Sequence, residues 1–289
     1  MIRRPPRSTP SNSSAASDVY KRQKVFIGQY SQNPSDIPFT LYRREAVEGV
    51  ESPTQPQGLR AEFTDSLILC DSNFSGHDDG IGHTKSSGVY LYYADSTTIS
   101  NVNVSENGKG FYLHGSHHTT MRNITVWDSR EYGLLYDSSI DNTVQVCTIG
   151  ECGHGLVVTD GSEVVLDQAT IVPNAGNSVW VNKGSNAMLV NSTVSGQIRA
   201  GINNGYVTLL NTSYEKEKVL VLSGAFTAQW YLDVKVLNES HQPVTSQMVV
   251  VSDNINGTET FTKATGPDGW ARWFVCTEYI QRSLSLIHI

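Results

Sequence analysis

The sequence has few cysteines and no long apolar run. Its four cysteines, Cys70, Cys147, Cys152 and Cys276, include no Cys-x-x-Cys pair and no spacing typical of a metal site, so they do not identify a redox compartment. Cys147 falls on an inward position of the repeat described below and is expected to pack as a small apolar residue. Between the two ends of the chain, no segment reaches the roughly 18 apolar residues that a membrane-spanning helix needs. These absences argue against a zinc-stabilised domain and a helical membrane protein.

Positive charge is scarce once the two ends are set aside. Residues 1–23 and 282–289 resemble translated sequencing-adaptor sequence, so we expect artefactual or disordered tails and natural termini that lie elsewhere. These tails hold six of the 21 basic residues and one of the 28 acidic residues, which leaves 15 against 27, a net charge of −12. Such a surface repels phosphate backbones and anionic lipids, which argues against nucleic-acid and membrane-surface partners.

A repeat of 22 to 23 residues runs through the middle of the chain. The repeats begin at Gly58, Gly80, Gly110, Gly133, Gly155, Ser178 and Gly201, and the single spacing of 30 contains an eight-residue insertion around IGHTKSSG, after which Gly88 restarts the period. A fixed period of this length predicts a solenoid in which each unit stacks on its neighbours.

Each repeat holds two short strands, because apolar residues recur at the same offsets with a spacing of two. The first strand has apolar residues one and three positions after the glycine: Val89, Phe111, Leu134, Leu156, Val179, Ile202, and Leu91, Leu113, Tyr136, Val158, Val181. The second has them at offsets eleven and sixteen: Ile99, Met121, Val144, Leu166, Leu189, and Val104, Val126, Ile149, Ile171, Val194. Burial of each such side chain is worth about 1.5 to 3 kcal/mol, so these columns are expected to form the core.

A polar column accompanies the apolar ones. Offset thirteen holds Asn101, Asn123 and Asn191, with Asp71 and Gln168 in equivalent places. We expect this ladder to be buried at a bend. It resembles the polar ladder of right-handed parallel β-helices of the pectate-lyase-like and NosD-like superfamily, and the resemblance covers about 170 residues. A leucine-rich repeat shares the period but requires a different strand motif and a helix or turn.

The resemblance implies an all-β fold, a right-handed parallel β-helix over residues 58–228. Residues 24–57 are expected to form an N-terminal cap or partial rung. Residues 229–281 have alternating strands separated by turn signals at Gln242-Pro243, Asn256-Gly257 and Pro267-Asp268-Gly269. This pattern resembles a carboxypeptidase-regulatory-like module, so we expect a partial Ig-like β-sandwich.

Three histidine–carboxylate pairs are predicted where stacked turns bring equal offsets about 4.8 Å apart. The pairs are His114 with Asp137, His117 with Asp95, and His118 with Asp141. They suggest a divalent metal or acid–base site, which a NosD-like copper-handling protein could use, provided that at least three of these side chains converge. The alternative is that they cap polar turns.

A second candidate site lies beside the insertion, where His77, Asp78, Asp79 and His83 occur in the segment GHDDGIGH. Paired carboxylates near a histidine resemble the catalytic group of polygalacturonase-type β-helix glycosidases. The family's upstream Asn-x-Asp and downstream Arg-x-Lys are absent at suitable places, and no carboxylate cluster for Ca²⁺ is visible. An ordinary polar loop explains the same residues.

An aromatic column is the third candidate. Tyr90, Tyr112 and Trp180 share offset two, which points outward, so we expect exposed rings that could stack on sugars, unless a loop or the C-terminal module covers them. Seven Asn-x-Ser/Thr sequons outside the tails are typical of exported proteins.

The sequence therefore predicts an exported, cell-surface or periplasmic protein with a polysaccharide or glycan partner, serving in adhesion or glycan binding with a structural stalk. A polysaccharide lyase or glycoside hydrolase and a NosD-like copper-handling protein remain alternatives, and the catalytic residues and any cofactor are left open.

Overall fold

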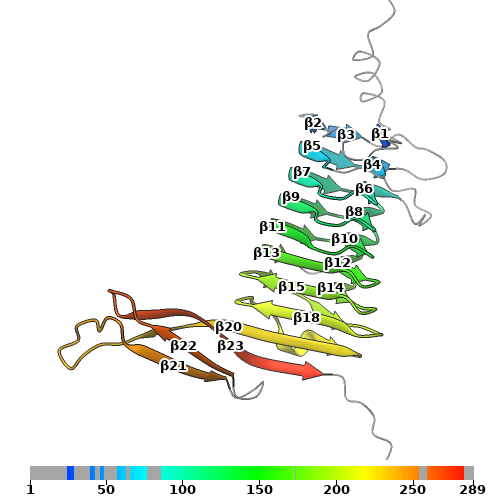
Figure 1. Cartoon of the computed structure of the whole chain (residues 1–289). Helices are drawn as coiled ribbons and strands as arrows, with labels where there is room; N and C mark the ends of the chain where they lie inside the picture. Colours follow the sequence, from blue (N-terminus) through cyan, green and yellow to red (C-terminus); the bar gives the residue numbers. More distant parts are fainter. Residues whose placement is uncertain are drawn as a thin grey trace, which may run out of the picture.

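The computed structural model describes residues 25–28, 40–42, 46–48, 57–62, 66–76, 86–172, 174–253 and 259–282. These residues form a stack of rungs with a smaller antiparallel module at the C-terminal end (Figure 1). The predicted all-β parallel β-helix is confirmed. Within the described ranges, no helix has the length and apolar character needed to cross a bilayer.

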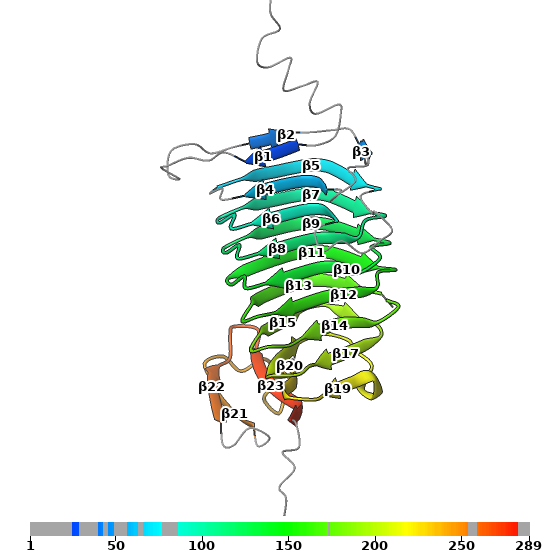
Figure 2. The same cartoon turned by 90° about the vertical axis from the view of Figure 1, so that its right-hand side faces the viewer.

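Two parallel sheets run the length of the stack, and successive strands alternate between them, so that each rung contributes to both sheets (Figure 2). Among the described residues, sheet A has nine strands, in the order β1 (Val25–Gly28), β4 (Gln57–Glu62), β6 (Ser87–Tyr92), β8 (Lys109–His114), β10 (Tyr132–Asp137), β12 (His154–Thr159), β14 (Asn177–Val181), β17 (Gln197–Ala200) and β19 (Val219–Val221). A 3₁₀ turn, Lys216–Lys218, precedes β19.

Sheet B forms the second wall of the stack. Its order is β2 (Thr40–Tyr42), β5 (Ile68–Ser75), β7 (Thr98–Ser105), β9 (Thr120–Trp127), β11 (Asn142–Gly150), β13 (Glu163–Ile171), β15 (Asn186–Val190), β18 (Gly205–Leu210), β20 (Gly224–Lys235) and β23 (Trp270–Arg282). The short strands β3 (Ala46–Glu48) and β16 (Thr193–Val194) pair with β5 and β13, respectively.

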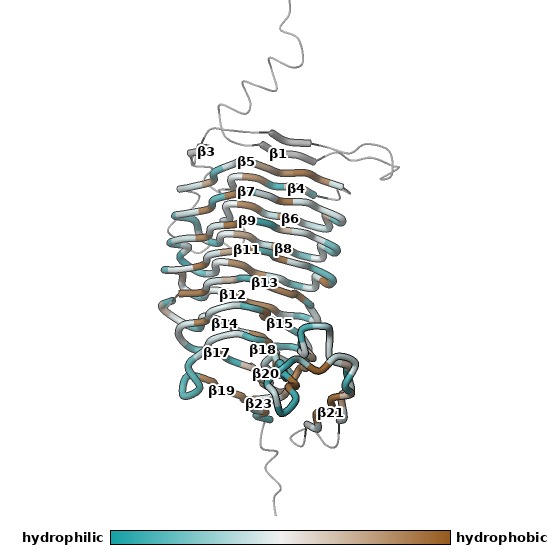
Figure 3. The backbone as a smooth tube through the Cα atoms, turned by 90° about the vertical axis from the view of Figure 1, so that its left-hand side faces the viewer, coloured by the Kyte–Doolittle hydropathy of each residue, from teal (hydrophilic) through white to brown (hydrophobic). Residues whose placement is uncertain are grey.

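The core consists of apolar columns in register from rung to rung, visible as recurring apolar positions in Figure 3. Val104 pairs with Val126, and Val126 pairs with Ile149, as the repeat predicts. All three side chains are at most 1% exposed. Equivalent offsets of successive repeats therefore lie above one another.

Glycine begins the strands of sheet A because neighbouring backbones approach closely there. A Cβ atom placed on Gly133 would lie 2.8 Å from the carbonyl oxygen of Gly155 on the next rung and 2.6 Å from a methyl carbon of Ile149. No ordinary Cβ makes such contacts, so the repeat restarts on the residue that lacks one.

The rung that begins at Ser178 is shorter than predicted. Val179 pairs with Ile198, and Val181 pairs with Ala200, so Ile198 continues the inner column about four residues earlier than expected. Ile202, predicted to be buried, is 61% exposed. The prediction of a repeat start at Gly201 is wrong, because the turn between β16 and β17 is shorter than the turn between β13 and β14, while Val194 on β16 still pairs with Ile171.

The asparagine ladder is present, but its side chains are exposed. Asn101 donates to Asp71 at 3.0 Å, Asn123 donates to Asn101 at 2.8 Å, and Asn211 donates to Asn191 at 2.8 Å. These residues adopt positive φ angles of about 50°, which bend the strands of sheet B and turn the side chains outward. The expectation that this ladder is buried is therefore wrong.

Serines form the buried polar ladder. The backbone N–H of Ser116 donates to the hydroxyl of Ser139 at 3.0 Å, and that of Ser139 donates to Ser162 at 2.9 Å. Ser162 repeats the arrangement with Ser185 at 3.1 Å. All four serines are 0% exposed, so this ladder satisfies backbone groups that the turns would otherwise bury without partners.

The C-terminal module grows directly from the solenoid. Strand β20 pairs in parallel with β18 and antiparallel with β23, so the predicted boundary between residues 228 and 229 falls inside β20. Strands β21 (Met248–Asp253) and β22 (Glu259–Ala264) form a separate antiparallel pair. The small antiparallel sheets are confirmed, whereas the assignment to an Ig-like module stays a prediction, as does the N-terminal cap over 24–57, most of which lies outside the described residues.

Candidate functional site

The outward column of sheet A carries the candidate site. Its members pair in register from β4 to β17: Arg60, Tyr90, Tyr112, Leu135, Val157, Trp180 and Arg199. The column is bulky at both ends and small in the middle.

The aromatic members of this column cover one another. The ring centroids of Tyr90 and Tyr112 are 4.9 Å apart, and the Arg60 guanidinium lies 5.7 Å from the Tyr90 centroid. Tyr90 is only 2% exposed, and Tyr112 and Trp180 are half-buried. The prediction that Tyr90 is an exposed ring is wrong, because a rung spacing of about 4.8 Å stacks large neighbours face on face.

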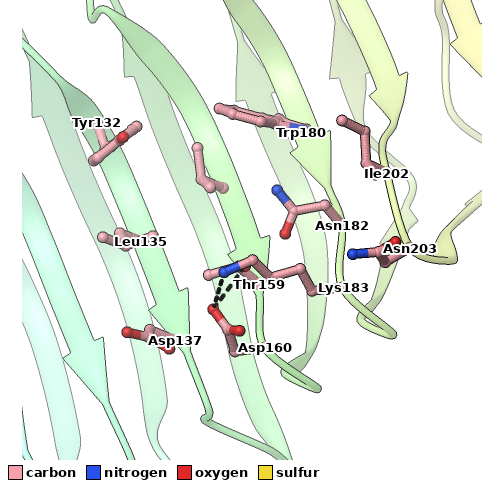
Figure 4. A pocket seen from close by; sticks show the side chains of 11 residues that line it. Tyr132, Leu135, Asp137, Thr159, Asp160, Trp180, Asn182, Lys183, Ile202 and Asn203 are labelled. Carbon is pink, nitrogen blue, oxygen red and sulfur yellow. Dashed lines mark hydrogen bonds and ion pairs between the residues drawn. The ribbon is translucent and has the colours of Figure 1, made fainter. Parts of the chain in front are cut away.

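A pocket of about 500 Å³ opens where the column becomes small. Leu135 and Val157 line it between the larger Tyr112 and Trp180, and Tyr132 adds a second aromatic wall (Figure 4). Sites that bind small molecules typically measure 300 to 1,000 Å³. The size gap in the column therefore creates a site-sized hollow on the face of sheet A.

Polar groups from successive turns surround the hollow. Asp137 ends β10, Thr159 ends β12, and Asp160, Asn182, Lys183 and Asn203 come from the turns that follow β12, β14 and β17. Lys183 Nζ lies 3.1 Å from Asp160 Oδ2, and the Thr159 hydroxyl donates to the same oxygen at 3.0 Å. Ile202, exposed because the preceding rung is short, completes the lining.

Two buried polar atoms beside the pocket lack a hydrogen-bond partner among the described residues. They are the indole Nε1 of Trp180 and the side-chain oxygen Oδ1 of Asn182, both on lining residues. Gly201 lies so close that a Cβ there would be 2.7 Å from Trp180 Nε1. Both atoms have almost no accessible surface, so a ligand in the pocket would not reach them unless neighbouring groups, such as Gly201 beside Nε1, moved.

Two of the three predicted histidine–carboxylate pairings occur between side chains, and the third is made by the backbone of His117. His114 Nδ1 lies 2.9 Å from Asp137 Oδ2, and His118 Nδ1 lies 3.6 Å from Asp141 Oδ2. Asp95 accepts a 2.8 Å hydrogen bond from the backbone N–H of His117 instead of from its ring.

The pairings do not converge. Within the described ranges, no three His, Cys, Asp or Glu side chains are grouped so that they could hold a metal ion. The convergence that the metal hypothesis requires of His114, His117, His118 and their carboxylates is therefore not met. His77, Asp78, Asp79 and His83 lie outside the described residues, and their role stays a prediction.

Asp137 joins one of these pairs to the pocket. It lines the pocket and accepts hydrogen bonds from His114 and from the Tyr112 hydroxyl, the latter at 3.2 Å. Burial, followed by the charge of Asp137, raises the pKa of Tyr112 above its ordinary value. The phenol therefore stays protonated and acts as a donor that fixes the carboxylate.

His154 supports the two aromatic walls and was not anticipated from the sequence. Its ring lies 5.8 Å from Tyr132 and 5.2 Å from Trp180, measured between centroids. Burial, together with the Arg199 guanidinium, lowers the pKa of His154 below its ordinary value. The backbone N–H of Asn177 donates to His154 Nδ1 at 2.8 Å, which leaves the proton of the neutral ring on Nε2.

Comparisons with known proteins agree with this architecture. Residues 52–195 match the family model described as "Right handed beta helix region". A search of curated proteins gives no match.

Three solved structures are similar to parts of the chain. An alginate lyase from Paenibacillus sp. str. FPU-7 is 15% identical over 53% of this chain and 65% of its own, with a TM-score of 0.42. The pectate lyase Pel9A is 15% identical over 60% of this chain and 54% of its own, with a TM-score of 0.44. The gp42 tailspike of Acinetobacter phage vb_AbaP_AS12 is 11% identical over 82% of this chain and 63% of its own, with a TM-score of 0.41. The family match and the register of the rungs together identify the chain as a right-handed parallel β-helix repeat protein.

Proposed function

We propose that this chain is a glycan-binding β-helix and that the pocket on sheet A holds part of the glycan. One observation carries the proposal: an apolar notch flanked by Trp180 lies beside charged and amide side chains that come from four successive rungs. A sugar ring combines an apolar C–H face with hydroxyl groups that both donate and accept.

The walls suit the apolar face of a sugar. Arg199 follows Trp180 in the column, with its guanidinium 5.4 Å from the indole centroid, while Val157 precedes it. The indole is therefore held from one side, and the side toward Val157 borders the pocket. Aromatic side chains held rigidly in this way supply contact area at a low cost in conformational entropy.

The rim suits the hydroxyl groups. Asp137 and Asp160 offer charged acceptors, which form stronger hydrogen bonds with hydroxyl donors than neutral groups do. Asn203 provides an amide that can donate and accept. With Asn182 and Lys183, groups of both kinds converge on one hollow from four successive rungs.

Binding fits the lining better than hydrolysis does. A typical glycoside hydrolase needs one carboxyl group that is protonated at the start of the reaction. Asp137 accepts a hydrogen bond from Tyr112, and Asp160 pairs with Lys183. Among the described lining residues, no carboxyl group is therefore left unengaged for this role.

Export to the cell surface or periplasm, with the solenoid as a stalk, is part of the same proposal. Several sequon asparagines, including Asn103, Asn191 and Asn238, are exposed, which a glycosylated exported protein requires. Fractionation of cells that carry the full gene tests this location, and recovery of the protein in the cytoplasmic fraction would contradict it.

The test of glycan binding combines a glycan array with calorimetry on the whole chain. Trp180→Ala removes the central aromatic contact, so we expect an affinity loss of about 2 kcal/mol, roughly 30-fold. Trp273→Ala is the matched control, because Trp273 is 60% exposed on β23, outside the pocket lining. Circular dichroism checks that both variants remain folded. The proposal fails if no glycan binds, or if the Trp180→Ala variant binds as tightly as the wild type.

A further inference from the structure

We infer that the pocket selects an uncharged, hydroxyl-rich stretch of glycan and discriminates against polyuronates. The inference rests on the proposed glycan binding and adds the class of ligand. The observation behind it is the arrangement of charges in and around the pocket.

The charges that line the pocket are predominantly negative. Asp137 and Asp160 are two carboxylates, and Lys183 is the single ammonium among the described lining residues. The ammonium is committed, because Lys183 Nζ lies 3.1 Å from Asp160 Oδ2. A uronate carboxylate entering this space would meet Asp137 without an unpaired lining cation to balance it.

The neighbouring cations do not change this conclusion. Lys109 on β8 is buried and lies 2.7 Å from Glu131. Arg199 is not a lining residue, and its guanidinium lies against the indole of Trp180. Among the described residues near the pocket, Arg199 is thus the cation that a uronate could still recruit. Uronate binding by the Arg199 guanidinium is therefore the alternative that the experiment must test.

The field of the whole molecule acts in the same direction. The chain carries 28 acidic and 21 basic residues, a formal net charge of −7. A net negative protein slows the approach of a polyanion and lowers its local concentration, and salt weakens this effect. A neutral glycan experiences neither penalty.

Neutral hydroxyl groups also satisfy the lining better than carboxylates do. The carboxylates of Asp137 and Asp160 are acceptors that need hydrogen donors. A sugar hydroxyl provides a donor, whereas an ionised uronate carboxylate adds only acceptors.

The experiment compares chemically matched ligands by calorimetry with the whole chain. The probes are hexasaccharides of glucose, galactose and mannose, the corresponding hexauronates, and a hexagalacturonate with its methyl ester. We expect each neutral member that binds to bind at least about tenfold more tightly than its uronate partner at low ionic strength, with the ratio falling as salt approaches about 1 M.

Two variants test the cause. Asp160→Asn removes a negative charge and releases Lys183, so uronate affinity should rise about tenfold while neutral affinity changes by less than about threefold. Lys183→Gln removes the lining ammonium, so it should weaken uronate binding relative to the wild type.

The outcomes separate the two proposals. If none of the probes and no glycan on the array binds, glycan binding itself fails. If a uronate binds more tightly than its neutral partner, or if Asp160→Asn leaves the ratio unchanged, only the ligand class is overturned. Tight uronate binding that Arg199→Gln abolishes would assign the recognition to the Arg199 guanidinium and likewise overturn this inference.

Discussion

A larger residue at Val157, which lines the pocket on sheet A, should abolish the proposed glycan binding without unfolding the solenoid. The substitution is Val157→Tyr, which places an aromatic ring between Leu135 and Trp180. The column already accepts such a pair, since Tyr90 and Tyr112 stack with centroids 4.9 Å apart. Val157 is 3% exposed, so the larger ring costs about 1 to 3 kcal/mol in packing strain. An additional aromatic pair contributes about 0.5 to 1.5 kcal/mol and offsets part of this cost, so we expect the folded state to tolerate the change.

The effect on binding follows from the dimensions of the site. Three rung spacings, about 14 Å, separate Tyr112 from Trp180, and Val157 occupies the rung next to Trp180. A tyrosine at position 157 would cover the indole face and occupy much of the 500 Å³ hollow. The ligand then loses both its aromatic contact and its volume, and we expect an affinity loss of at least about 3 kcal/mol, more than 100-fold.

Calorimetry with the best glycan on the array measures the affinity, and thermal unfolding measures stability. The matched control is Val165→Tyr, at an outward position of sheet B that is 39% exposed. Both variants should unfold within about 4 °C of the wild type, because 1 kcal/mol corresponds to roughly that shift in a chain of this size. Unchanged affinity in Val157→Tyr would refute the location of the site.

Three further predictions concern the solenoid itself. The buried hydroxyl of Tyr136 donates only to a thioether sulfur 3.8 Å away, so Tyr136→Phe should raise the free energy of unfolding in urea by about 0.5 to 1 kcal/mol; a loss would contradict this view. Ser139→Ala should cost about 1 to 3 kcal/mol by leaving the Ser116 N–H unpaired, whereas the exposed control Ser138→Ala should cost far less, and equal costs would exclude the serine ladder as the cause. Burial raises the pKa of Cys147 to about 12, so its thiol ionises at a lower pH in the unfolded chain than in the folded chain. The contribution of Cys147 to the free energy of unfolding should therefore be constant below about pH 9 and fall between about pH 9 and 12. Urea titrations of Cys147→Ala across this range should show a smaller fall than those of the wild type.

The core of the fold could be predicted because the apolar residues that form it recur in the sequence at a fixed period. Each inward residue contacts the residue at the same offset one rung away, so a correct period of 22 or 23 residues is enough to predict the pairing of Val104, Val126 and Ile149. The same reasoning predicted the three histidine–carboxylate contacts. Stacking converts sequence separation into spatial contact wherever the period holds.

Departures from the period could not be anticipated in this way. The rung that begins at Ser178 is shortened in the turn between β16 and β17, and alternation alone offers both Ile198 and Ile202 as core candidates. A single slip changes which side chains face inward, as it does for any strand. Ile202 consequently lies outside and lines the pocket.

The exposure of the polar ladder also depended on backbone geometry that the pattern does not encode. Asn123 and its equivalents adopt left-handed φ angles, which asparagine tolerates better than most residues. The same column contains Val146 at a φ of 57°, so the bend is imposed by the stack and not by residue type alone. The position of a residue within the repeat predicts which column it belongs to, whereas its backbone φ angle determines whether its side chain faces the core or the solvent.

The pocket itself was within reach of the sequence, because the outward column was known and only the sizes of its members went uncompared. In a parallel stack, an outward side chain is covered mainly by its neighbours one rung above and below, so a large residue is exposed where the next one is small. Tyr90 is hidden because Tyr112 follows it, whereas Trp180 borders a hollow because Val157 precedes it. In this β-helix, the decrease in side-chain size along the outward column therefore identifies the aromatic face that no neighbour covers, which the positions of the aromatic residues alone do not.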